Sequence, residues 1–143
     1  MAGSKADGFE NDVLKAATGQ ATTILSTTPI TAYLALFTSD PTDAGTAGTE
    51  ATGGGYARIT TAGKWGAPSG GVVSNDAQIA FAQFSGTVSA GAPFTHFMLI
   101  THLSNAPAAG NVLYVGTLTD QTKTGANGDT IVFNIGQLTL TET

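Results

Sequence analysis

The 143-residue chain is 41% hydrophobic and only 10% charged, and its 5 basic and 10 acidic residues give a net charge of −5. This length suits one domain that buries about 70% of its unfolded surface, and so apolar a composition excludes intrinsic disorder. The absence of Cys excludes disulfides, thiolate metal sites and cysteine nucleophiles, and the acidic balance argues against binding to nucleic acid phosphates.

Neither the first residues nor the densest apolar run has the pattern of a targeting or membrane signal. Residues 1–13, MAGSKADGFENDV, have neither the basic stretch nor the apolar core of a signal peptide, so we interpret them as mature sequence. The densest apolar run, FMLI at 97–100, is far shorter than the roughly 20 residues that cross a bilayer. We therefore expect a soluble protein that does not bind membranes.

One short helix is expected near the start of the chain, over about residues 8–18. The apolar residues that recur there with helical spacing are Phe9, Val13, and Ala16 or Ala17. Asp7 and Glu10 have the spacing of a capping box with Asp7 as the cap, and Gly19 is placed to end the helix.

Short runs rich in β-branched and aromatic residues follow residue 30, and clusters of Gly, Pro, Asn and Asp separate them. The runs expected to form strands are 31–38, 56–61, 77–84, 94–101, 111–118, 130–135 and 137–141. This pattern predicts an all-β fold, a compact antiparallel β-sandwich or a small, jelly-roll-like barrel. We interpret residues 1–143 as a single domain, with an N-terminal arm carrying the helix over 1–28 and the β-sandwich over 29–143.

The strand-like runs differ in how many of their faces are apolar. Runs 31–38 and 94–101 are apolar at both odd and even positions, which predicts central strands covered on both faces. In the run 77–84, Ile79 and Phe81 share one face while Gln78 lies on the other, so one face is expected to be buried.

Two long connections interrupt this pattern. Residues 41–55, PTDAGTAGTEATGGG, have low complexity and nothing to pack, so a mobile or functional loop is expected. Residues 62–76 form the second connection and contain Trp65, the only Trp of the chain.

The residues that could perform chemistry are few and scattered. His96 and His102 lack a nearby carboxylate in sequence, so we expect one packed or hydrogen-bonded His and one at a strand end. Ser104 does not lie in the G-x-S-x-G motif that presents a nucleophile. The loop acids lack the spacing of a calcium loop. We therefore expect no catalytic residues, no cofactor and no metal.

The glycine run GGGYAR, residues 53–58, is the most distinctive local motif. It lacks the Lys-Ser/Thr of a phosphate-binding loop and leads into a strand instead of a helix. We expect a flexible approach to a strand on which Tyr56 and Arg58 share a face. Arg58 is expected to pair with an acid such as Asp40 or Asp43.

Several segments together carry a family resemblance that covers nearly the whole chain. They are YLALFTSDPTDAGTAGTEATGGGYAR, APSGG, SNDAQIAF, THFMLI and GNVLYVGTLT. In combination they resemble small virion proteins of tailed bacteriophages, often called tail fibre proteins. The chain departs from the usual pattern at TTILSTTPI and TAGKWG. The resemblance implies a structural role in the virion without enzymatic activity.

A compact, acidic β domain without internal repeats differs from an elongated fibre shaft. We therefore expect a capsid decoration or cement protein that binds the major capsid protein on the capsid exterior and forms a homo-oligomer, a trimer rather than a dimer. The candidate interface residues are Tyr56, Arg58, Trp65, Phe9 and Val13. Truncation of an anchor such as Tyr56 or Trp65 is expected to weaken binding and leave the fold intact.

Two alternatives were weighed against capsid decoration. The first is a tail fibre or baseplate component that binds a glycan of the host surface, with Trp65 as the stacking platform. The second is a small hydrolase, for which the sequence offers no convergent polar site. Copy number distinguishes the tail alternative from capsid decoration, because a tail component is present in far fewer copies than a capsid decoration.

Overall fold

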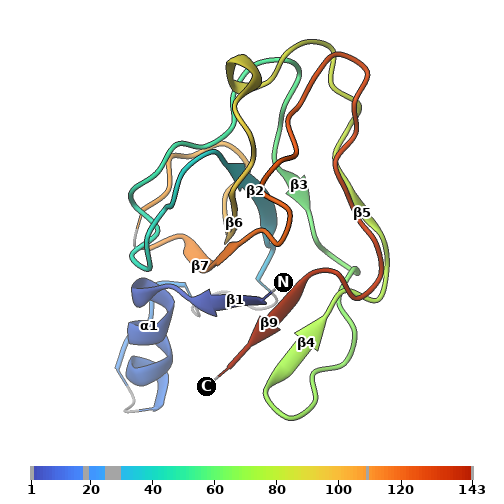
Figure 1. Ribbon diagram of the computed structural model, residues 1–143. Helices are drawn as coiled ribbons and strands as arrows, with labels where there is room; N and C mark the ends of the chain where they lie inside the picture. The colour runs from blue at the N-terminus through green and yellow to red at the C-terminus, as the bar shows by residue number, and fades with distance from the viewer. Residues whose placement is uncertain (1, 18–19, 25–29, 109, 143) are drawn as a thin grey trace.

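The computed structural model describes residues 2–17, 20–24, 30–108 and 110–142. Figure 1 shows a small body of short strands with the helix packed at one side. In chain order the elements are β1 (Ala2–Lys5), α1 (Asp7–Ala17), β2 (Tyr33–Phe37), β3 (Ile59–Thr60), β4 (Val72–Ser74), β5 (Ile79–Ala80), the 3₁₀ turn η1 (Ser89–Gly91), β6 (His96–Ile100), β7 (Val112–Thr117), β8 (Val132–Phe133) and β9 (Thr139–Thr141).

The strands form a curled, half-barrel sheet of seven strands, in the order β3-β2-β6-β7-β1-β9-β4, and a two-stranded ribbon, β5-β8. The all-β prediction is therefore confirmed. The pairings are antiparallel except for β1 with β9, which run parallel. Because no tight hairpin connects these two strands, a parallel pairing is available to them.

Each of the seven predicted runs contains a strand, and every one of these strands is shorter than predicted. The sequence pattern missed β1 and β4. The β1 sequence, AGSK, has none of the β-branched or aromatic residues that indicate a strand. A glycine is required at position 3 of this strand by close packing, because a Cβ there would lie 2.9 Å from Cζ of Phe97. Residues 2–5 of the expected N-terminal arm thus belong to the sheet.

The helix is confirmed over Asp7–Ala17, close to the predicted range. Its cap is Ala6, not Asp7, because the Ala6 carbonyl accepts the first helical hydrogen bond from the Glu10 amide at 3.0 Å. Asp7 and Glu10 therefore lie inside the first turn, where their negative charges interact favourably with the helix dipole. The predicted stop at Gly19 lies outside the described residues.

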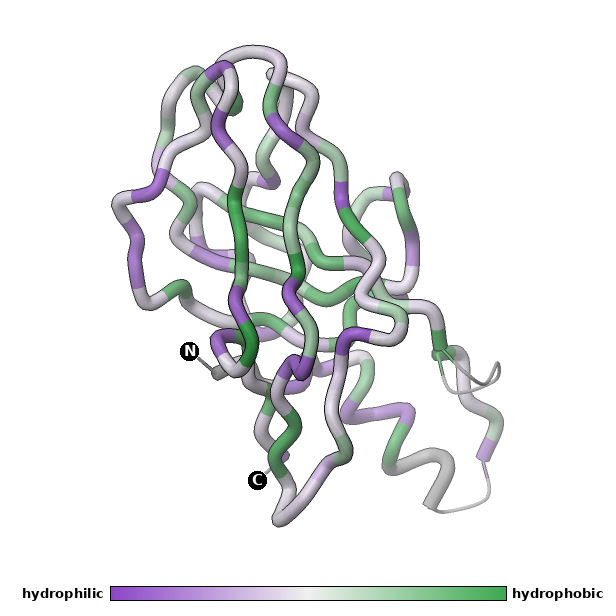
Figure 2. The backbone as a smooth tube through the Cα atoms, turned by 90° about the vertical axis from the view of Figure 1, so that its right-hand side faces the viewer, coloured by the Kyte–Doolittle hydropathy of each residue, from purple (hydrophilic) through white to green (hydrophobic). Residues whose placement is uncertain are grey.

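Strands β2 and β6 lie at the centre of the sheet and are buried on both faces, as predicted. Figure 2 shows hydrophobic residues along the strands in the middle of the body and hydrophilic residues mainly in turns and loops. On one face, Leu34 and Leu36 pack with Phe97 in the larger core cluster. On the opposite face, Phe37 and Met98 belong to a second cluster.

The loop over 41–55 packs against the sheet, so the expectation that it has nothing to pack against is wrong. Pro41, Gly45 and Ala51 are buried. The Ala51 amide donates to the Leu36 carbonyl at 2.8 Å, and thereby extends the pairing of β2. A Cβ at Gly45 would lie 2.6 Å from Cγ1 of Val112, which explains why a residue without a side chain occupies this place.

The buried Asn75 connects the two-stranded ribbon to the large sheet. Its side-chain amide donates to the carbonyls of Ala77 and Asn134, both at 2.9 Å, and its Oδ1 accepts from the Leu138 amide at 2.9 Å. One side chain thus joins residues 75–77 to residues 134–138, which are distant in sequence. Among the described residues, no helix has the length and apolar character of a membrane span.

Candidate binding surface

Arg58 and Glu50 form a largely buried ion pair beneath the surface. Arg58 donates from Nε to Oε1 of Glu50 at 2.7 Å and from Nη2 to Oε2 at 2.6 Å, while Nη1 donates to the His102 carbonyl at 2.7 Å. Only 7% of Arg58 is exposed. The prediction that Arg58 pairs with Asp40 or Asp43 is therefore wrong.

Tyr56 belongs to the same internal network. Its hydroxyl donates to Oε1 of Glu50 at 3.1 Å and accepts from the Leu36 amide at 2.9 Å, and its ring stacks on Phe81. Burial raises the pKa of Tyr56, and the nearby Glu50 carboxylate raises it further. Tyr56 and Arg58 both contact Glu50, but they precede β3 (Ile59–Thr60), so the prediction that they share a face of that strand is wrong. The Tyr56 hydroxyl accepts a hydrogen bond from a backbone amide of β2. We therefore expect truncation of Tyr56 to destabilise the fold, whereas truncation of an interface anchor would leave the fold intact.

The two candidate residues on the helix have different environments. The Phe9 ring is half-buried and meets Tyr114 edge-on, with the ring centres 5.9 Å apart. This contact attaches α1 to β7. Val13 is 38% exposed. Of these two side chains, Val13 is the one open to a partner.

Trp65 lines a shallow hollow beside the outer strand β3. The cavity has a volume of about 350 Å³ and is lined also by Ile30, Thr31 and Thr61. Trp65 packs partly against the larger core cluster, and its backbone pairs with Asn75 as an isolated β-bridge. The hollow combines an aromatic ring with the exposed Thr31, whereas the Thr61 hydroxyl is buried and donates to the Ala32 carbonyl at 3.2 Å.

The two histidines lie at opposite ends of β6. Nδ1 of His96 lies 2.8 Å from the Thr95 hydroxyl, and its Nε2 lies 3.8 Å from Asp40. His102 follows the strand, is exposed, and has its Nδ1 3.0 Å from the Thr101 hydroxyl. This confirms the prediction of one hydrogen-bonded His and one at a strand end. Within the described ranges, no three His or carboxylate groups are arranged to hold a metal ion.

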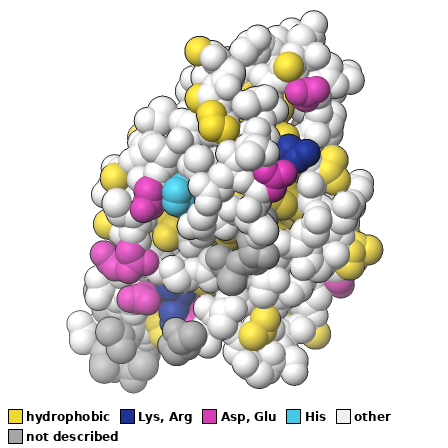
Figure 3. Space-filling model, in the orientation of Figure 1, with side chains coloured by type: hydrophobic (Ala, Val, Ile, Leu, Met, Phe, Trp, Pro, Cys, Tyr) yellow, Lys and Arg dark blue, Asp and Glu magenta, His cyan; other side chains and the backbone are white. Residues whose placement is uncertain are grey.

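Acidic side chains gather near the helix (Figure 3). Asp43 lies close to Asp7 and Glu10, and its side chain shares a hydrogen bond with that of Asp7. Partial desolvation, reinforced by Asp7, raises the pKa of the Asp43 carboxyl. The loop over 41–55 is attached to α1 by a hydrogen bond from the Asp7 amide to the Asp43 carbonyl at 3.4 Å, and the like charges of the nearby side chains oppose this contact.

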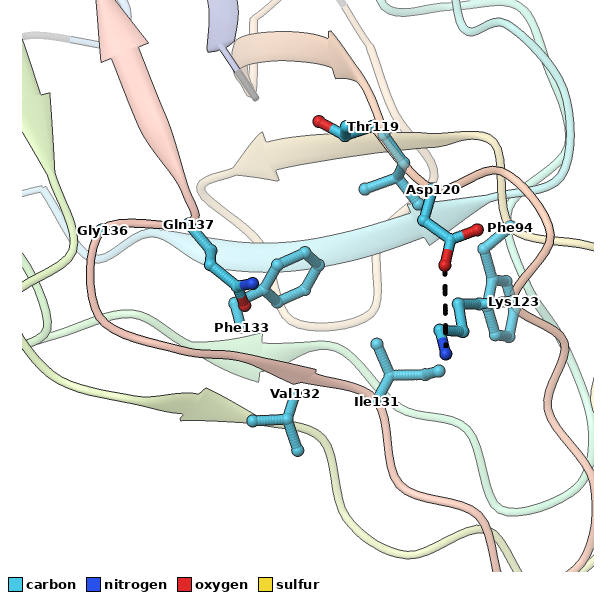
Figure 4. A pocket seen from close by; sticks show the side chains of 10 residues that line it. Phe94, Thr119, Asp120, Lys123, Ile131, Val132, Phe133, Gly136 and Gln137 are labelled. Atoms are coloured by element: carbon cyan, nitrogen blue, oxygen red, sulfur yellow. Dashed lines mark ion pairs between the residues drawn. The ribbon is translucent and has the colours of Figure 1, made fainter.

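A larger groove, of about 460 Å³, lies between residues 118–123 and 131–137. Phe94, Leu118 and Phe133 form its buried floor. Asp120 and Lys123 lie on its rim, with 3.9 Å between the carboxylate and the ammonium (Figure 4). Sequence reasoning missed this groove, because it exists only where residues 118–123, residues 131–137 and Phe94 meet in the folded chain.

The fold and these surfaces define a small all-β module with shallow hollows and a buried Glu50–Arg58 ion pair. The chain belongs to the family described as podophage GP4 fiber I protein gp80, whose model matches residues 4–141. It is therefore a fibre-type structural protein of a bacteriophage virion. A comparison with curated proteins found no match.

Proposed function

We propose that the chain is a tail fibre or baseplate component that contacts the host surface. The observation that carries this proposal is the family match, which runs from within β1 to the end of β9. Because the match includes the whole sheet, the fibre-type role is attributed to the β domain itself and not to an appended segment. This favours the tail over the capsid exterior.

The hollow at Trp65 is the proposed host contact. Binding sites for small ligands combine aromatic surface with a few polar groups that fix orientation, and this hollow provides Trp65 together with the exposed Thr31. A saccharide of the host surface has both the apolar ring face and the hydroxyl groups that suit such a site. The proposed partner is therefore a glycan.

The proposed role is non-enzymatic. The buried Glu50–Arg58 pair is engaged in internal hydrogen bonds, and the two histidines are separated by the length of β6. Those groups therefore support the fold instead of converging on a substrate.

Capsid decoration, with the major capsid protein and further copies of this chain as partners, is the second candidate. One observation favours it: the chain is a small body without internal sequence repeats, unlike an elongated fibre shaft. Such a protein would lie over the joints between capsid subunits on the outside of the particle.

Copy number distinguishes these two candidates. Quantitative mass spectrometry of purified virions would give the ratio of this protein to the major capsid protein. A ratio far below one supports the tail location, because tails contain few symmetric copies. A ratio near one, or a simple fraction of one, would contradict it and establish the decoration role.

A further inference from the structure

The hollow at Trp65 adjoins a second hollow, which has a volume of about 440 Å³. Thr101 and His102 line this second hollow, and Ile30 and Thr31 line both hollows. Each volume lies near the lower end of the range of roughly 300–1,000 Å³ that is typical of small-ligand sites. Because the hollows share two residues, one ligand can extend from the first into the second.

The strand order explains why the two hollows adjoin. Strands β3, β2 and β6 are neighbours in the sheet, and Tyr33 of β2 pairs with Thr60 on one side and with Ile100 on the other. Thr31, two residues before Tyr33, therefore lies between the chain that follows β3 and the chain that follows β6. Because neighbouring strands are about 4.8 Å apart, the hollows together extend roughly 10 Å across these three strand ends.

The two hollows offer different contacts to a ligand. The first presents the Trp65 ring, whereas the second presents the half-buried Thr101 and the exposed His102, whose Nδ1 lies 3.0 Å from the Thr101 hydroxyl. Among the described residues, no carboxylate lines either hollow, so a basic peptide would find no counter-charge there. An aromatic face followed by hydrogen-bonding groups suits a chain of sugars, each with an apolar ring face and hydroxyl groups.

Internal hydrogen bonds hold the backbone at both ends of this surface. At the second hollow, Nη1 of the buried Arg58 donates to the His102 carbonyl at 2.7 Å. At the first hollow, the Thr61 amide and hydroxyl both donate to the Ala32 carbonyl, at 3.0 and 3.2 Å. A ligand therefore meets a surface that is ordered before binding, which lowers the entropic cost of association.

We propose that the two hollows form one site for an extended saccharide that runs across the ends of β3, β2 and β6. One sugar stacks on Trp65, and a later sugar of the same chain forms hydrogen bonds with His102 and Thr101. The inference rests on the proposed glycan contact and deepens it, because it identifies the ligand as an oligosaccharide chain instead of a single terminal sugar.

The first test compares saccharide fragments of different length. Purified host surface polysaccharide is partly hydrolysed and sorted by size, and isothermal titration calorimetry gives the affinity of each size for the purified full chain. We expect the affinity to rise at least about tenfold from the shortest fragment that binds to fragments that reach both hollows, because two further hydrogen bonds of ordinary strength supply that factor. At greater lengths the affinity should level off.

The second test removes the imidazole. His102→Ala should abolish most of the gain with length and leave the affinity for the shortest fragment unchanged. The variant retains the His102 carbonyl that Arg58 binds, so its circular dichroism melting should match that of the wild type. Leu103→Ala is the matched control, because Leu103 is the next residue, is 55% exposed and lines neither hollow. It should keep the full gain. Trp65→Ala should instead lower the affinity for short and long fragments alike.

The third test concerns the residue between the hollows. Thr31→Val keeps the shape of an exposed side chain and removes its hydroxyl, so it should weaken binding of the long fragments. Thr124→Val makes the same change at an exposed threonine that lines neither hollow, and it should leave the affinity unchanged.

Three results would overturn the extended site, and they differ in what they leave standing. Equal affinity for all lengths, with binding that still depends on Trp65, would leave the proposed glycan contact intact. A preference for long fragments that neither His102→Ala nor Thr31→Val reduces would mean that the added sugars bind elsewhere. Absence of binding at every length would overturn the glycan contact as well. Copy number in the virion tests the tail location separately from all three.

Discussion

The Arg58 guanidinium and the Glu50 carboxylate meet side-on, through two hydrogen bonds of 2.7 and 2.6 Å, with 4% and 20% of their side chains exposed. An arginine–carboxylate pair of this geometry is among the stronger polar contacts in proteins. Its location means that one of the five basic residues stabilises the fold and is removed from the outer surface.

Replacement of Glu50 by Gln should strongly destabilise the protein. The Arg58 charge would remain buried without a counter-charge, which costs about 3–5 kcal/mol in comparable pairs. Urea unfolding measures this loss. Lys123→Ala is the control, because it breaks an exposed ion pair and should leave the free energy of unfolding nearly unchanged. Equal effects of the two substitutions would show that the buried ion pair contributes no more to the free energy of unfolding than the exposed pair.

Tyr56→Phe should destabilise the fold while keeping the ring stacked on Phe81. It leaves the Leu36 amide without its acceptor, and an unsatisfied buried donor costs about 1–3 kcal/mol. Tyr56→Ala removes the ring as well and should cost about 3–5 kcal/mol in total. Chemical denaturation of both variants separates the hydroxyl from the ring. A Tyr56→Phe variant as stable as the wild type would contradict the proposed role of the hydroxyl.

Gly54→Ala should be more destabilising than Gly63→Ala, although both glycines have positive φ, +58° and +67°. The left-handed conformation alone costs an Ala about 1–2 kcal/mol. At Gly54 the new Cβ would also lie 2.5 Å from the Gly86 carbonyl oxygen, whereas at Gly63 it would meet nothing within 4 Å. The difference in melting temperature between the Gly54→Ala and Gly63→Ala variants measures the steric contribution to the destabilisation. If both variants melt alike, the glycine run is needed only for its backbone conformation.

Asp43→Asn should stabilise the protein at neutral pH and lose that advantage in acid. The pKa of Asp43 is raised in the folded state, so its ionised form costs stability above that pKa. Below the unfolded value of 3.8 the carboxyl is protonated in both states and the cost vanishes. Urea unfolding of both proteins from pH 7 to pH 3 measures the difference. A constant difference across this range would exclude the carboxyl as its source.

Trp65→Ala should reduce binding of the purified protein to host cells if the hollow at Trp65 is the host contact. Trp65→Phe, which keeps an aromatic surface, should retain part of the binding. Val72→Ala serves as the control, because it shortens an exposed side chain, 38% accessible, on another strand. Flow cytometry with labelled protein gives the comparison. Undiminished binding by Trp65→Ala would remove this hollow from the proposal.

The amino-acid pattern was most informative where structure depends on neighbours in the chain. The spacing of Phe9 and Val13 identified the helix, and apolar residues on both faces identified β2 and β6 as central strands. Both signals are periodic and local, so no tertiary information is needed to detect them.

The pattern was least informative where a residue's role depends on a distant partner. Glu50 is recognisable as the partner of Arg58 only once the loop over 41–55 has folded back along β2. Strand β1 has little strand propensity of its own, and its place between β7 and β9 is determined by the strands already there. The groove between residues 118–123 and 131–137 depends in the same way on segments that meet only in the folded chain.

The sequence by itself determined the all-β class, the single helix, the central strands and the family, because these depend on residue periodicity and on motifs contiguous in the chain. Only the tertiary structure decided that Tyr56 and Arg58 act inside the protein, that the glycine-rich loop packs on the sheet, and that an apolar groove lies open beside Asp120 and Lys123. These features require pairing between residues far apart in the chain, and the free energy of such pairs depends on burial, which sequence spacing does not specify.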